Sequence, residues 1–198
     1  MKYFILLFIF TISIFALSIN ESLLKIHAVL VPKIYLMDYK FKQKLYNNSI
    51  VIALLYDQRS YKSAVSLKNK IETKYKNGIK EYNIKIKLLS YNKIADTKAN
   101  IYYLFPTDTK SIKQVVKIAN SNHALTFSYL NDDLKYGIML SLKVGNKIKP
   151  IINLSAAKSN EVTFRPVLLD ISKIYIEKSM LNFNNRHLLN FNLYLTMV

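Results

Sequence analysis

The chain has 198 residues, of which 51% are apolar, and this suits one domain with an ample hydrophobic core. It contains no cysteine, so disulfides and thiolate metal sites are both excluded. The formal net charge is +17, but only 3 of the 29 basic residues are arginines, the side chains on which base and phosphate recognition depends most. We therefore expect no specific nucleic-acid site, and only weak attraction to anionic lipid headgroups or cell-wall polymers.

The first eighteen residues have the order of an export signal. Lys2 precedes an apolar run at 3–17, and Ala16-Leu17-Ser18 has small residues at the two positions that a signal peptidase reads. The run is shorter than the ~20 apolar residues of a spanning helix. We therefore predict cleavage after Ser18, with a retained N-terminal anchor as the alternative. In both cases the domain, expected at 19–178, lies in the periplasm.

The domain should alternate strands and helices. A helix is predicted over 21–39, and Pro32 should bend or break it. Four apolar runs have the composition of strands: 50–55, 84–89, 101–105 and 124–128. Apolar residues recur at helical spacing after Ser60, which can cap a helix, and again after the turn at 106–109. This rhythm predicts an α/β fold with a mostly parallel, twisted sheet, right-handed crossovers and flanking helices.

A β-hairpin at the edge of that sheet is predicted next, followed by a helix in two parts. Its strands are expected at 136–144 and 147–154, with a two-residue turn at Gly145-Asn146, and Pro150 indicates an edge position. Asn153 can cap a short helix at 154–158, and a second helix should run through Val167 to Tyr175 with Pro166 in its first turn. The positions that we expect to be buried here are Leu140, Leu142, Ile152, Leu154, Leu168 and Ile171.

Several stretches of this region resemble the C-terminal signature of YfiR-like proteins. They are Gly137-Ile138-Met139, Ile152 to Ala157, Val162-Thr163-Phe164 and Leu168 to Ile171. The matching structural residues are Gly137, Ile152, Asn153, Leu154, Ala156, Ala157, Leu168, Leu169 and Ile171. Glu161 stands where the family usually has glycine, so we expect Asn160 to take the left-handed backbone conformation instead.

YfiR-like proteins are small periplasmic proteins, best known as regulators of inner-membrane diguanylate cyclases, and related domains are sensor modules of histidine kinases. The resemblance implies that the partner of this chain is an inner-membrane signalling protein, and it leaves a homodimer open. Residues 179–198 lie beyond the signature. Their mixture of asparagine with phenylalanine and leucine is expected to form a loosely attached tail, with a packed extra strand at 188–195 as the alternative.

The sequence shows no catalytic or cofactor motif. The three glycines form no phosphate loop, and no serine lies in a glycine-flanked elbow. His27 has no second ligand at metal-binding spacing, so we expect an ordinary core or surface histidine. Asp132-Asp133 is expected to be a solvated turn. We predict no enzyme and no cofactor, with a hydrolase whose residues assemble only in space as a distant alternative.

One group of residues predicts a ligand crevice. Ligands of open parallel sheets bind beyond the carboxyl ends of the strands, where the strand order reverses. For the order second, first, third, fourth, this point lies between 56–60 and 106–109. The candidate residues are Asp57, Arg59, Ser60, Thr107 and Thr109. Helix amides near Asp108 or Thr109, together with Arg59, would attract an anion, and the alternative is ordinary helix capping.

The sequence therefore favours a non-enzymatic periplasmic regulator or sensor that contacts a membrane signalling protein. The alternative is a periplasmic protein that binds a small ligand in the crevice. A large exposed apolar patch would favour the regulator, and a deep crevice at the strand ends would favour the binding protein.

Overall fold

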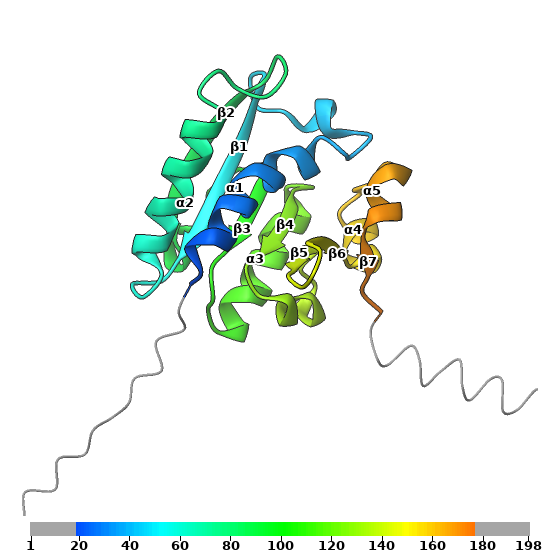
Figure 1. The fold of residues 1–198 in the computed structure, drawn as a ribbon. Helices are drawn as coiled ribbons and strands as arrows, with labels where there is room; N and C mark the ends of the chain where they lie inside the picture. The colour runs from blue at the N-terminus through cyan, green and yellow to red at the C-terminus, as the bar shows by residue number, and fades with distance from the viewer. Residues whose placement is uncertain (1–18, 177–198) are drawn as a thin grey trace, which may run out of the picture.

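A seven-stranded sheet runs through residues 19–176, the part of the chain that the computed structural model describes (Figure 1). Its strand order is β2-β1-β3-β4-β5-β6-β7. The strands are β1 (Ser49–Tyr56), β2 (Asn83–Ser90), β3 (Ile101–Leu104), β4 (Leu125–Ser128), β5 (Leu140–Lys143), β6 (Lys149–Ile152) and β7 (Lys173–Ile174). Only the β5–β6 pair is antiparallel in this sheet. The predicted α/β fold, with its mostly parallel sheet, is confirmed. The predicted export signal and the tail at 179–198 lie outside the described residues.

Helices cover both faces of the sheet. They are α1 (Glu21–Tyr35), α2 (Tyr61–Lys74), α3 (Thr109–Ser121), α4 (Leu154–Ser159) and α5 (Pro166–Ile171), with 3-10 turns η1 (Phe41–Lys44), η2 (Tyr91–Lys93) and η3 (Asn131–Tyr136). Helices α1 and α2 (Figure 1) share one apolar core with Ile52 and Tyr103, whereas α3 shares a second core with Ala53 and Tyr102. Neighbouring residues of β1 and β3 thus enter opposite cores, which explains their continuous apolar runs.

Helix α1 is continuous through its proline. The Asn20 side chain caps its first turn by accepting hydrogen bonds from the backbone amides of Ser22 at 2.8 Å and Leu23 at 3.1 Å. The helix continues past Pro32 to Tyr35, so of the predicted bend or break the break is wrong, and the helix ends before the predicted Tyr39. The residues around Pro32 are buried against the sheet, and this packing outweighs one lost backbone hydrogen bond.

The turn between β5 and β6 differs from the prediction. Five residues, 144–148, separate the strands, because Lys143 pairs with Lys149 and Leu140 pairs with Ile152. A two-residue turn would pair Leu140 with Ile151 instead, and this one-residue slip would move Ile152 out of the core. Burial of Ile152 therefore outweighs the local turn signal, and Gly145 lacks the positive φ that such a turn requires.

The last helix is shorter than predicted. Helix α5 begins at Pro166, as expected, but ends at Ile171, and Ile174 belongs to β7 instead of the helix. The reason is non-local, since β7 pairs with Ile151 and Ile152 along the free side of β6. Strand β6 is consequently not the outermost strand, although Pro150 itself lies just beyond the residues that β7 pairs.

The signature residues are mostly structural, with two exceptions. Asn153 caps α4, as predicted, by accepting a hydrogen bond from the Ala156 amide at 3.0 Å. Ile152, Ala156, Ala157 and Leu168 are buried, as are Leu140 and Leu142. Leu154 and Ile171 are wrong as core predictions, because they are 42% and 58% exposed. Both belong to six-residue helices, which have too little length to bury more than one face.

The left-handed residue after α4 is Glu161, with φ 54°, and not Asn160, with φ −103°. This corrects the expectation for Asn160. Its side-chain amide is already committed, because Nδ2 donates to the carbonyl of Ala156 and to Oδ1 of Asn120. The buried amide keeps Asn160 in its place, and the left-handed turn falls on the next residue.

We expect Ile152→Ala to lower the free energy of unfolding by ~2–5 kcal/mol, because it leaves a cavity in the core. The matched change Leu154→Ala, at an exposed aliphatic of the same segment, should cost less than ~1 kcal/mol. Urea denaturation of both variants measures this difference. Equal costs would mean that the register of β5 and β6 is not held by Ile152.

Candidate functional site

The first loop of the predicted crevice is occupied by its own ion pair. Arg59 Nη2 lies 2.6 Å from Asp57 Oδ2, and the Arg59 side chain is 82% exposed. Ser60 donates from Oγ to Asp57 Oδ1 at 2.9 Å. Ser60 stands at the N-cap of α2 but makes no side-chain capping bond, so its predicted capping role is wrong. The loop is therefore a self-contained turn in which Asp57 is the acceptor.

The second loop shows ordinary helix capping. Asp108 Oδ1 accepts from the Ser111 amide at 2.9 Å, and its Oδ2 accepts from the Ser111 hydroxyl at 2.8 Å. A carboxylate of the chain thus holds the amides that were expected to attract an anion. Thr107 is half-buried and Thr109 is exposed. The ligand crevice stays a prediction. Each of its two loops carries a carboxylate, Asp57 in the first and Asp108 in the second.

A buried tyrosine, Tyr91, lies close enough to these carboxylates for its pKa to be affected. Tyr91 donates from its hydroxyl to the Phe105 carbonyl. Burial raises the pKa of Tyr91 well above its ordinary value, and the charges of Asp133, Asp57 and Asp108 raise it further. Three carboxylates therefore lie near this buried hydroxyl, and one of them, Asp57, is paired with Arg59.

Asp133 is buried, so the prediction of a solvated Asp132-Asp133 turn is wrong for this residue. Ser128, at the end of β4, donates from Oγ to Asp133 Oδ2. Burial raises the pKa of the Asp133 carboxyl, and this outweighs the opposite effect of the hydrogen bond from Ser128.

The raised pKa of Asp133 gives a pH-dependent prediction. The folded chain holds this proton more tightly than the unfolded chain, so the stabilising contribution is lost as the pH rises from the unfolded pKa of ~3.9 through the raised folded pKa. Asp133→Asn should therefore gain stability relative to the parent as the pH rises to 7. Urea melts of both proteins between pH 3 and 7 measure it. A stability difference that is constant across this range would contradict the prediction.

His27 is a core histidine. Its side chain is fully buried, and burial lowers its pKa to about 3. Nδ1 lies 2.6 Å from the Tyr103 hydroxyl, and the ring packs edge-on against Tyr103 and Phe127. Within residues 19–176 there is no group of three or more histidines and carboxylates that could hold a metal ion.

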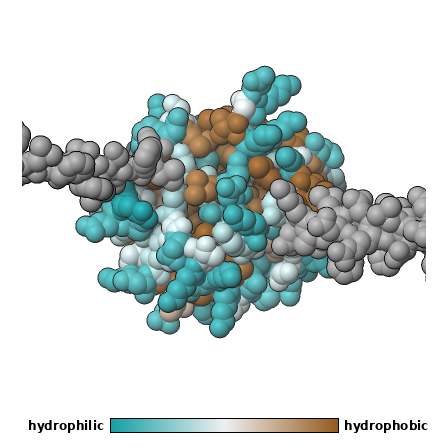
Figure 2. Space-filling model, turned by 90° about the horizontal axis from the view of Figure 1, so that it is seen from below, coloured by the Kyte–Doolittle hydropathy of each residue, from teal (hydrophilic) through white to brown (hydrophobic). Residues whose placement is uncertain are grey.

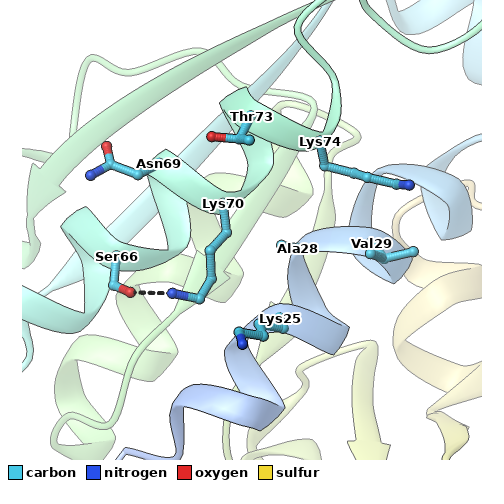
Figure 3. A pocket seen from close by; sticks show the side chains of 8 residues that line it. All are labelled: Lys25, Ala28, Val29, Ser66, Asn69, Lys70, Thr73 and Lys74. Carbon is cyan, nitrogen blue, oxygen red and sulfur yellow. Dashed lines mark hydrogen bonds between the residues drawn. The ribbon is translucent and has the colours of Figure 1, made fainter.

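A polar groove lies between α1 and α2. It has a volume of about 680 Å³ and is lined by Lys25, Ala28, Val29, Ser66, Asn69, Lys70, Thr73 and Lys74 (Figure 3). Lys70 is already engaged, since its Nζ lies 2.7 Å from Glu21 Oε2 and donates to Ser66 Oγ at 2.7 Å. Most of its lining residues are polar, and the groove is broad and open.

A polar hollow of about 240 Å³ lies beside the family signature. Its lining residues are Val116, Asn120, Leu134, Lys135, Gly137, Asn153, Ser155, Ala156, Ser159, Asn160 and Tyr175. Gly137 has φ +95°, and a Cβ there would lie 3.2 Å from a methyl carbon of Val116, so both conformation and space favour glycine. Asn160 is buried, and its Oδ1 has no hydrogen-bond partner among the described residues.

The third hollow, which we call the apolar groove, has a volume of about 220 Å³. Leu30, Lys33, Ile34 and Met37 form one wall, and Ile148, Pro150, Val167, Leu168 and Ile171 form the other. Val167 and Ile171 are 59% and 58% exposed. Hydrophobic side chains also reach the surface among hydrophilic ones on the face that Figure 2 draws.

Sequence reasoning missed the apolar groove, although one signal was present. Val167 and Ile171 are four residues apart and share a face of α5, whereas Leu168 is the residue that enters the core. A six-residue helix with apolar residues on two faces must leave one face exposed. The sequence contained no signal that the other wall comes from α1.

A family model described as YfiR/HmsC-like matches residues 43–173. The chain belongs to this family. YfiR/HmsC-like proteins are periplasmic regulators of cyclic-di-GMP signalling that act with membrane signalling partners, and they are not known as enzymes. The match runs from η1 into β7, so α1 precedes it, and the resemblance noted in the signature is confirmed.

Comparison with one solved structure supports the fold. A conserved domain protein from Vibrio cholerae O1 biovar El Tor has 14% sequence identity and a TM-score of 0.54, over 76% of this chain and 59% of that chain. An ABC domain from Streptococcus pneumonia, solved in complex with L-Trp, has 15% identity and a TM-score of 0.48, over 70% and 59%. None of the curated proteins compared with the chain matches it significantly. Within the described residues, no helix is long and apolar enough to cross a membrane.

Proposed function

We propose that this protein is a periplasmic regulator that binds an inner-membrane signalling protein, a diguanylate cyclase or a histidine kinase, through the apolar groove. The observation that carries this proposal is the groove itself, whose wall residues Val167 and Ile171 are more than half exposed. Concave apolar surfaces of this kind mark interaction sites in soluble proteins. Family membership supports the same class of function.

The groove has the form that receives an amphipathic helix. Residues of α1 and Met37 just after it form one wall, and residues of α5 form the other together with Ile148 and with Pro150 of β6. A partner helix with aliphatic residues at i, i+3 and i+4 would fill such a groove. Lys33 is the one charged residue of the lining, so we expect the extracytoplasmic segment of the partner to place an acidic residue there.

We expect Val167→Asp to weaken partner binding by ~30-fold or more, because it places a charge in the centre of an apolar contact. Regulation should be lost, so that cellular cyclic-di-GMP or kinase output equals that of a strain without the protein. The melting temperature should change little, since Val167 is largely exposed.

Leu154→Asp is the matched control. Leu154 is also an exposed aliphatic at the start of a short helix, but it does not line the groove. This variant should regulate normally. Normal regulation by Val167→Asp, with the protein folded and present at the usual level, would refute the groove as the partner site.

A second candidate function is the binding of a small polar ligand in the polar hollow. The observation that favours it is Asn160 Oδ1, a buried acceptor without a partner among the described residues. The ligand would donate a hydrogen bond to this oxygen and contact Asn120 and Lys135, which also line the hollow. This site differs from the crevice that the sequence predicted.

Native mass spectrometry of the protein purified from the cell envelope tests this second function. We expect a stoichiometric small molecule on the parent chain and its loss, about tenfold or more in occupancy, from Asn120→Leu, because this change removes a polar contact and the acceptor that holds the Asn160 amide. Parent protein that carries no small molecule, whether isolated directly or after incubation with envelope extract, would eliminate it.

A further inference from the structure

The loop between β5 and β6, taken together with the strand ends Lys143 and Lys149 that flank it, combines lysines with exposed aliphatic residues. All residues from Lys143 to Lys149 are exposed, and they read Lys-Val-Gly-Asn-Lys-Ile-Lys. Val144 is 55% exposed and Ile148 is 38% exposed. The stretch contains three lysines and no acidic residue. Ile148 is partly covered in the wall of the apolar groove, whereas burial in the domain does not account for Val144.

The lysines of this loop form no ion pair among the described residues. The ion pairs that lysines form among residues 19–176 involve Lys44, Lys68 and Lys70, and none involves the loop. The charge of the loop is therefore fully available to an external anionic surface.

We propose that this loop is a membrane-contact element that binds the surface of an anionic phospholipid bilayer. Val144 enters the headgroup region, Lys143, Lys147 and Lys149 pair with lipid phosphates, and Ile148 stays in the wall of the apolar groove. The contact is independent of what occupies the apolar groove, because Val144 does not line that groove.

The chemistry of the loop fits a bilayer better than other anionic surfaces. A hydrophilic cell-wall polymer would pair with the lysines but would give Val144 no apolar environment. Val144 is 55% exposed in a loop beside Gly145, and a soft headgroup layer could surround it without a preformed pocket. Each lysine near an anionic membrane surface contributes about fivefold in affinity, so three contribute about a hundredfold.

The position of the loop adds a functional reason. Ile148 and Pro150 line the apolar groove, so the loop is continuous with the rim of the site proposed for the signalling partner. A bilayer bound by the loop would hold this rim close to the membrane surface. A membrane-embedded partner would then meet the groove at a raised local concentration.

The absence of cysteine allows a direct test at one position. Val144→Cys provides a single site for an environment-sensitive fluorophore on the protein purified from the envelope. With vesicles of equal phosphatidylglycerol and phosphatidylcholine, we expect a blue shift and quenching by a bilayer-embedded quencher, both reduced by salt. Tyr61→Cys on α2, labelled in the same way, should show neither effect. Any contribution of a retained N-terminal segment to vesicle binding is the same in both labelled proteins, so the comparison between them removes it.

Matched charge variants test the lysines. Replacing Lys143, Lys147 and Lys149 together by Gln should weaken vesicle binding about a hundredfold. Replacing the exposed Lys110, Lys113 and Lys117 of α3 by Gln removes the same charge and should weaken it less than about threefold.

Several results would overturn the proposal. Equal losses from the two triple variants would show general charge attraction without a site. Unchanged fluorescence of the label at position 144 on phosphatidylglycerol vesicles would exclude insertion. A shift that appears only with the extracytoplasmic domain of a signalling protein would make the loop a protein interface. Val144→Ser that binds vesicles as tightly as the parent would exclude an apolar contribution.

Discussion

The burial of β1 and β3 on both faces is the constraint on which the rest of the structure depends. All residues from Ile50 to Leu55 are buried, and they alternate between two cores. Each face of these strands needs a helical layer, which α1 and α2 supply on one side and α3 on the other. Charge is thereby excluded from the centre, so the lysines lie on the outer surfaces and on the edge strand β2, where Lys85 and Lys87 are exposed.

The same constraint explains which parts of the fold could be predicted. Apolar runs and helical spacing are local signals, so β1 to β4 and the helices between them follow from the sequence. The β5–β6 register could not be predicted, because Gly145-Asn146 favours a turn that differs by one residue from the pairing that buries Ile152. The end of α5 depends on the free side of β6, which becomes visible only once the sheet is assembled.

The candidate sites show the same division between local and assembled features. The crevice at the strand ends was predicted from topology. In the structure its polar groups are already bonded within the chain, Asp57 to Arg59 and Asp108 to Ser111. The apolar groove was missed because its walls come from α1 and α5, at opposite ends of the described chain. The polar hollow was missed because Asn120 and Asn160 meet only in space, although Gly137 and Asn153 of the signature border it.

The origin of the groove walls has a consequence for quality control in the cell. Leu30 and Ile34 belong to the first helix of the described domain and Val167 to the last, so the groove exists only after the whole sheet between them has formed. A fragment, or a chain trapped with either end detached, presents at most one wall. Contacts between such distant segments also form late during folding, because the entropic cost of closing the long loop between them comes first. A receptor that binds this groove would therefore bind the completely folded protein and would not bind nascent or damaged chains.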